Sequence, residues 1–169
     1  MYDTILYPTD GSAGSEAALD HVAELAGTYG ATVHVLHAVD SSAHLGLGIG
    51  GDPKAEDAPG MVGHPDGDGP GMVGERDRVE HLRERMEEQG ETLVEEVTSQ
   101  LADVDTEAVV RGGDPHQIII DYAEEIDADL IVMGTHGRTG IDRYLLGSVA
   151  EKVVRLSDVP VVTVRREET

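Results

Sequence analysis

The stretch DLIVMGTHGRTGIDRYLLGSVAEKVV, residues 129–154, decides the fold. After Asp129, its residues LIVMG form an uninterrupted apolar run, which is typical of a strand buried on both faces. Apolar residues at helical spacing end the stretch. Between them lies a glycine cluster: Gly134, Gly137, Gly140 and Gly147. Glycines in an ordered loop indicate that the chain turns sharply or that something approaches its backbone closely.

The same strand-then-helix order recurs along the chain. Strands are predicted at 2–8, 31–39, 106–112, 129–134 and 159–164, and a helix follows each of the first four. This alternation predicts an α/β fold: a doubly wound, five-stranded parallel sheet in the order 3-2-1-4-5, with helices on both faces. Ligands of such sheets bind beyond the carboxyl ends of the strands, where the winding reverses.

The helix ends carry local signals. Ser12 is predicted to cap the first helix and Gly30 to end it, while Asp114 and Pro115 open the third. The second helix, 76–101, places its apolar residues on one stripe: Val79, Leu82, Met86, Leu93, Val97 and Leu101.

The length of 169 residues favours a single domain, 1–169. Residues 41–75 depart from its pattern, because they hold ten glycines and four prolines. Such a composition is typical of a loop insertion rather than of a helix or strand.

The composition excludes several classes of function. The chain has 34 acidic and 12 basic residues, a net charge of -22, so nucleic acids and anionic membranes would repel it. Surface repulsion of this size is screened in concentrated salt, which favours a halophilic, salt-adapted origin. The absence of cysteine excludes disulfides and thiol chemistry. No signal peptide or apolar run of membrane-spanning length is found, so we expect a cytoplasmic protein.

The glycine cluster also has the character of an anion site. Backbone N–H groups at Gly134, Gly137 and Gly147, followed by a helix N-terminus, can hold phosphate without a cationic side chain. Ser148, His136 and Arg138 could add contacts. The loop is not a P-loop, since no lysine precedes Ser148, and its glycine spacing differs from that of the dinucleotide fingerprint.

The glycines do fit the pattern G-x2-G-x9-G-S, which resembles the ATP-binding signature of the universal stress protein family. The opening strand with YPTDGS, the segment HAVD, the segment VMGTHGRTG and the closing SVAEKVVRLSDVPVVTVR resemble that family as well. The resemblance covers residues 1–40 and 76–166.

This resemblance implies a nucleotide-dependent stress-response protein that binds ATP, with AMP or ADP as other occupants and Mg²⁺ or Mn²⁺ as a companion ion. It also implies a homodimer paired through residues 159–165. The nucleoside would contact the ends of three strands: Pro8, Thr9, Asp10, Val39 and Met133. The phosphates would contact the glycine loop and the next helix: Gly134, Gly137, Gly147, Ser148 and Val149. Apart from the resemblance, His136 and Arg138 could add charge to this loop.

Other interpretations remain open from the sequence. Asp10 could be only a turn residue, and Ser148 could simply cap the fourth helix. The chain could be a slow ATPase or phosphotransferase, or a nucleotide-free dimeric scaffold. No catalytic group stands out, and no metal site is expected, because His34 and His37 lie on opposite faces of their strand.

Overall fold

The computed structural model describes residues 1–40, 73–135 and 146–166. Their strands form one parallel sheet in the order β3-β2-β1-β4-β5, as the sequence predicted. The strands are β1 (Thr4–Pro8), β2 (Thr32–Val39), β3 (Thr106–Gly112), β4 (Leu130–Gly134) and β5 (Val161–Val164). The winding direction reverses between β1 and β4, which pair in parallel at the centre of the sheet.

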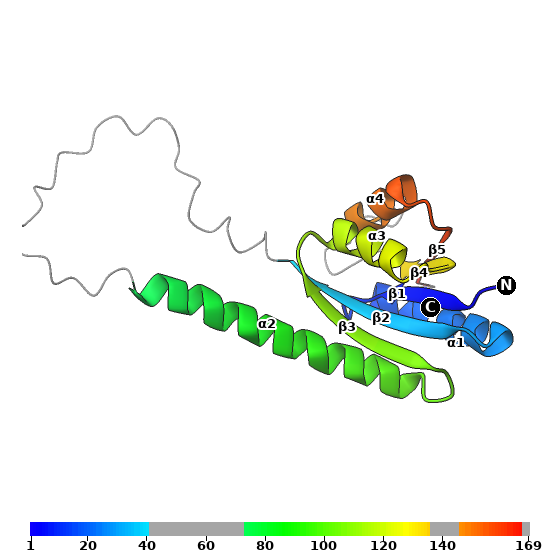
Figure 1. Ribbon diagram of the computed structural model, residues 1–169, viewed down its shortest axis with the longest axis horizontal. Coiled ribbons are helices and arrows are strands. Elements are labelled where there is room, and N and C mark those ends of the chain that lie inside the picture. Colours follow the sequence, from blue (N-terminus) through cyan, green and yellow to red (C-terminus); the bar gives the residue numbers. More distant parts are fainter. Residues whose placement is uncertain (41–72, 136–145, 167–169) are drawn as a thin grey trace, which may run out of the picture.

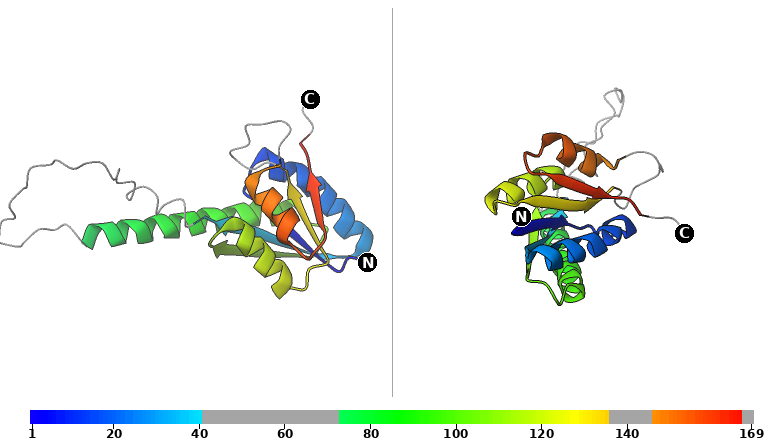
Figure 2. Two further views of the ribbon diagram at one scale, coloured as in Figure 1. Left: turned by 90° about the horizontal axis from the view of Figure 1, so that it is seen from above. Right: turned by 90° about the vertical axis from the view of Figure 1, so that its right-hand side faces the viewer.

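Helices cover both faces of this sheet, as Figures 1 and 2 show. They are α1 (Ala13–Tyr29), α2 (Val73–Gln100), α3 (Pro115–Glu125) and α4 (Ser148–Leu156). Residues of α1 and α2 share one core cluster with alternate residues of the strands, and residues of α3 and α4 share the other. The alternation is clear in β1, where Ile5 and Tyr7 belong to the first cluster and Leu6 to the second.

The predicted helix ends are confirmed for α1 and α3. The side chain of Ser12 accepts the N–H of Ser15 at the start of α1, and Gly30 ends that helix in the left-handed conformation. Asp114 caps α3, with Pro115 in its first turn. The fourth helix differs from the sequence interpretation: its N-cap is Gly147, so Ser148 is the first helical residue and not the cap.

Helix α2 extends beyond the sheet on its N-terminal side (Figure 1). Its later residues, Val94 and Val97, are buried against the sheet, whereas Val79 is 60% exposed and Leu82 is 46% exposed. The predicted apolar stripe is therefore buried only over its second half. The predicted insertion, 41–75, lies outside the described residues up to position 72.

Asp129 fastens the start of β4 to the start of β1. One of its carboxylate oxygens accepts the backbone N–H groups of Asp3 (2.8 Å) and Thr4 (3.0 Å). These two hydrogen bonds favour the ionised form and lower the pKa of Asp129. The contact joins the two central strands at their amino ends, opposite the switch-point ends of β1 and β4.

A polar cluster lies under α3, on the face of β2 and β3. Nδ1 of His34 lies 2.9 Å from the hydroxyl of Tyr122, and Arg111 stacks over the Tyr122 ring. Arg111 also forms a bidentate ion pair with Glu125, which lowers the pKa of that carboxyl group. The cluster joins β2, β3 and α3. Within it, the buried His34 has the Tyr122 hydroxyl as a hydrogen-bond partner.

Candidate functional site

The carboxyl ends of β1 and β4 lie side by side at the switch point. Leu6 pairs with Ile131 in the ladder, so Pro8 and the residues after it leave the sheet beside the end of β4. Gly147 joins the same edge, because its N–H donates to the carbonyl of Thr135 at 2.7 Å. The predicted residues of the β1 loop and the start of α4 are therefore neighbours.

Each polar atom of Thr9 makes at least one hydrogen bond. Its N–H donates to the carbonyl of Leu36 (2.9 Å), and its hydroxyl donates to Ser15 Oγ (3.1 Å) and accepts the N–H of Gly11 (3.2 Å). Its carbonyl accepts a hydrogen bond from Nδ1 of His37 at 2.8 Å. Thr9 is 6% exposed. Its contribution to a ligand site is therefore to fix the loop, and Asp10 follows it.

Asp10 begins the turn into α1. Its Oδ1 accepts the N–H of Ser12 at 3.0 Å, and its side chain is half-buried. This contact confirms the turn role that the sequence allowed for Asp10. The role is compatible with a ligand contact, because each carboxylate oxygen can accept more than one hydrogen bond.

Tyr7 and Ser15 support the loop between β1 and α1. The Tyr7 hydroxyl donates to the backbone carbonyl of Ser15 at 2.7 Å, and both residues are buried. Burial disfavours the phenolate and raises the pKa of Tyr7 to about 12. The hydroxyl is thus a fixed donor that ties β1 to the first turn of α1.

Gly134 has a structural reason to be glycine. A Cβ there would lie 2.9 Å from the backbone nitrogen of Ser15 and closer still to the carbonyl group of Gly14. The backbone that approaches Gly134 is therefore that of α1. At position 134 the glycine is therefore required by the close approach of the α1 backbone.

The start of α4 offers backbone donors. Gly147 is its N-cap and makes no side-chain capping hydrogen bond. The first N–H groups of a helix have no partner inside the helix, and here they belong to Ser148, Val149 and Ala150. The N–H of Gly147 is different, since Thr135 already accepts it. Contrary to the sequence interpretation, this amide is not bare.

Three of the predicted apolar residues lie in the interior. Met133 is 6% exposed and belongs to the core cluster under α3 and α4, and Val149 packs against the same cluster. Val39 is 4% exposed, and its carbonyl accepts the N–H of Gly113. His136, Gly137 and Arg138 lie outside the described residues.

Sequence reasoning missed the residues that support this loop. His37 lies on the α2 face, with its ring against the backbone at Gly90, while His34 lies on the α3 face. The predicted opposite orientation is confirmed. Among the described residues no group of three or more His, Cys, Asp or Glu side chains could hold a metal ion. Strand alternation placed His37 on its face, but no pattern indicated its bond to Thr9.

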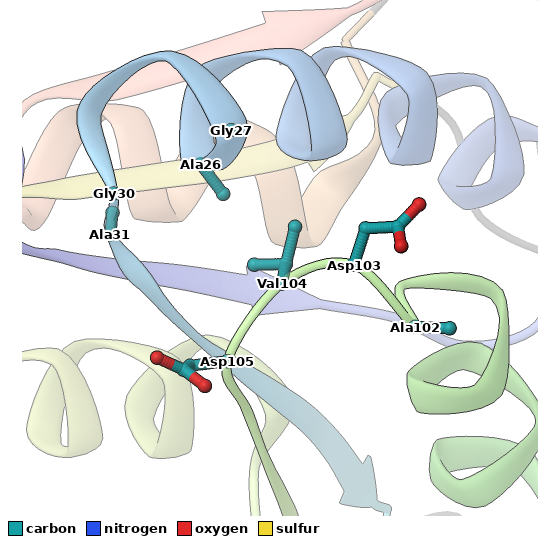
Figure 3. A pocket seen from close by; sticks show the side chains of 8 residues that line it. All are labelled: Ala26, Gly27, Gly30, Ala31, Ala102, Asp103, Val104 and Asp105. Atoms are coloured by element: carbon teal, nitrogen blue, oxygen red, sulfur yellow. The ribbon is translucent and has the colours of Figure 1, made fainter.

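A cavity of about 310 Å³ lies at the other end of the sheet. It lies between the C-terminus of α1 and the α2–β3 connection, lined by Ala26, Gly27, Gly30, Ala31, Ala102, Asp103, Val104 and Asp105. The carboxylates of Asp103 and Asp105 point away from each other (Figure 3). The cavity is therefore separate from the switch point and offers no converging ligands.

Comparison with known proteins gives the family. The sequence profile of the universal stress protein family matches residues 1–165. The chain belongs to the universal stress protein family. It is 31% identical to universal stress protein MJ0577 of Methanocaldococcus jannaschii over 175 residues, covering 100% of this chain and 98% of that protein. The solved structure of MJ0577 superposes with a TM-score of 0.77 and 28% identity, covering 100% and 99% of the two chains.

Two more distant structures share the fold. An Arabidopsis thaliana universal stress family protein, solved with AMP bound, is 16% identical with a TM-score of 0.60, covering 98% of this chain and 92% of that one. A universal stress protein in complex with cAMP is 22% identical with a TM-score of 0.58, covering 97% of each chain. No helix in the described ranges is both long and apolar enough to cross a bilayer.

Proposed function

We propose that this chain binds ATP between the loops after β1 and β4 and acts as a nucleotide-dependent regulatory or protective module in the stress response. One observation carries the proposal: the N-terminus of α4, whose N-cap is a glycine without a side chain, follows the end of β4 at the switch point, where β4 lies beside β1. Backbone amides at a helix N-terminus bind phosphate without a basic side chain. This is important in a chain with a net charge of -22.

The proposed contacts divide by chemistry. The amides of Ser148 and Val149 hold phosphate oxygens, and Gly147, lacking a side chain, allows the phosphates to approach. Asp10 accepts from a ribose hydroxyl or the base, with Pro8 and Thr9 fixing the loop. Met133, Gly134 and Val39 form the floor of the nucleoside pocket. His136, Gly137 and Arg138 complete the phosphate loop, and Mg²⁺ or Mn²⁺ accompanies the phosphates.

The relatives support the ligand class. The structures solved with AMP and with cAMP share this fold, so an adenine nucleotide is the ligand to test first. AMP and ADP are alternative occupants. Concentrated salt is the proposed working medium, because it screens the repulsion between a polyphosphate and an acidic surface.

A Gly137→Val variant is expected to bind ATP at least about tenfold more weakly, a loss of roughly 1.4 kcal/mol. The added side chain would keep the phosphates from the backbone of the loop. Titration calorimetry in concentrated salt gives the affinity. The control is Gly27→Val, because a Cβ at Gly27 meets no atom within 4 Å and lies at the opposite end of the sheet. Equal ATP affinities in the two variants would show that the loop does not hold phosphate.

The proposed unit is a homodimer paired through β5. This strand pairs only with β4 in the described part of the chain, so its outer edge is open. Exposed apolar side chains lie close to that edge: Val162 on β5, with Val154 and Leu156 on α4, the helix that packs against β5. An open edge with apolar side chains favours pairing with a second copy.

A Thr163→Pro variant is expected to be a monomer of 18.0 kDa, whereas the unmodified protein has twice this mass. Ile131 donates to the carbonyl of Pro160, and Thr135 to that of Val164, so the even-numbered residues of β5 bond to β4. Thr163 therefore directs its N–H outward, and proline removes it without breaking the β4 ladder.

Light scattering in concentrated salt measures the mass. The matched control is Thr163→Val, which keeps the backbone N–H and is expected to stay dimeric. A Thr163→Pro variant that is still a dimer would place the contact elsewhere.

A further inference from the structure

The loop that the proposed nucleotide needs is supported by α2, at the point where this helix reaches the sheet. Two contacts make this connection. The ring of His37 lies so close to α2 that a Cβ at Gly90 would be 2.8 Å from its Cδ2. Leu93, one turn further on, lies against Gly11, where a Cβ would be 3.1 Å from Cδ1 of the leucine.

Both contacts end on the segment between β1 and α1. His37 donates from Nδ1 to the carbonyl of Thr9, since a carbonyl oxygen can only accept. Gly11 has a φ of +71°, which favours glycine, and its N–H returns to the Thr9 hydroxyl. Helix α2 thus reaches residues 9–11 through His37 and Leu93.

Gly90 has no other evident role. It lies inside a helix, where glycine is less favourable than alanine, and no turn requires it there. Its missing side chain is the space that the His37 ring uses, with Val110 also within 3.1 Å of the Cβ position.

We propose that His37 is a positioning residue for the nucleotide loop, and that the turn of α2 from Gly90 to Leu93 transmits the position of α2 to it. This inference rests on the proposed function for its ligand.

Gly90→Ala is expected to bind ATP about five- to tenfold more weakly, the size of one lost hydrogen bond. Its methyl group displaces the His37 ring from Thr9. The matched control is Gly27→Ala in α1, where the new Cβ has no neighbour within 4 Å. It gains the same helix propensity, so its Tm should rise by roughly 1–4 °C with ATP affinity unchanged.

Substitutions of His37 separate positioning from general stability. His37→Asn places an amide donor near the position of Nδ1 and is expected to bind ATP within about twofold of the unmodified protein, whereas His37→Ala should lose about five- to tenfold. Adding Gly90→Ala to His37→Ala should cause less further loss than Gly90→Ala causes alone, because the His37 ring is gone and only the tight contact with Val110 remains.

The amide resonances of Thr9 and Gly11 in the nucleotide-free protein give a second readout. Gly90→Ala is expected to shift both, and Gly27→Ala neither. If Gly90→Ala keeps full affinity and unshifted resonances, or weakens binding equally with and without His37, the inference is wrong. If the unmodified protein binds no adenine nucleotide, the proposed function fails, and the resonances still decide whether α2 positions the loop.

Discussion

Replacing Gly134 with alanine is expected to lower the free energy of unfolding by about 3 kcal/mol or more, the upper range for overpacking. The new Cβ would lie within 3 Å of the Ser15 nitrogen and nearer still to the carbonyl group of Gly14. Both neighbours are backbone atoms in the first turn of α1, so no side-chain rotation can relieve the collision. Either α1 or β4 must move, and both belong to the core.

Urea denaturation of Gly134→Ala and Gly27→Ala in the same buffer measures the effect. Gly27→Ala is the control, because its Cβ meets no atom within 4 Å and the helix gains roughly 0.5–1 kcal/mol from alanine. The two variants should therefore differ in opposite directions from the unmodified protein. A Gly134→Ala protein within about 0.5 kcal/mol of the original would mean that α1 yields easily and that the contact is not a constraint.

Gly134 shows what a sequence can and cannot reveal about a glycine. Composition indicated that the cluster meets a geometric demand, and this is confirmed at Gly134. The partner could not be predicted, because Gly14 is 120 positions away along the chain. Only the pairing of β1 with β4 brings the first turn of α1 against the end of β4.

The strands and the sheet order could be predicted because local patterns and chain connectivity agree. The apolar residues LIVMG, 130–134, form β4 and are buried over the first four positions. Ser12 and Asp114 begin their helices and Gly30 ends its helix, as predicted. Right-handed crossovers between parallel strands then leave few arrangements.

Helix α2 shows where periodicity stops being informative. The stripe that includes Val79 and Val97 correctly predicted a helix, yet one residue is 60% exposed and the other 7%. Helical spacing shows that residues share one face of a helix. It does not show how far along the helix the sheet extends to cover that face. The first half of α2 extends beyond the sheet (Figure 1), and its residues Val79 and Leu82 are exposed.

The candidate site could be placed but not detailed from the sequence. The topology places the carboxyl ends of β1 and β4 side by side, as predicted. The supporting contacts are long-range: Thr9 bonds to Leu36, Ser15 and His37, which lie on different elements. Hydrogen bonds between elements leave no periodic signal in a sequence, whereas a turn such as that of Asp10 with Ser12 is local and was anticipated.

The buried Tyr7 hydroxyl is expected to make the fold sensitive to alkali. Its pKa is raised to about 12 in the folded state and is near 10 in an unfolded chain. Above pH 10 the unfolded chain releases this proton while the folded one retains it, so unfolding becomes easier as the pH rises. The stabilisation is complete below pH 10 and is lost between pH 10 and 12, at up to about 1.4 kcal/mol per pH unit.

Urea denaturation at pH 8, 10 and 11 measures this slope, and Tyr7→Phe is the control. Without the hydroxyl, the Ser15 carbonyl loses its buried donor, which costs roughly 1 kcal/mol at pH 8. The same variant has nothing to titrate at position 7, so its stability should fall less steeply between pH 10 and 11. A shallow slope remains, because burial also raises the pKa of Tyr122. If the free energy of unfolding falls with the same slope above pH 10 in Tyr7→Phe and in the unmodified protein, the pKa of Tyr7 is not raised by burial and the hydroxyl is not held in its hydrogen bond to Ser15.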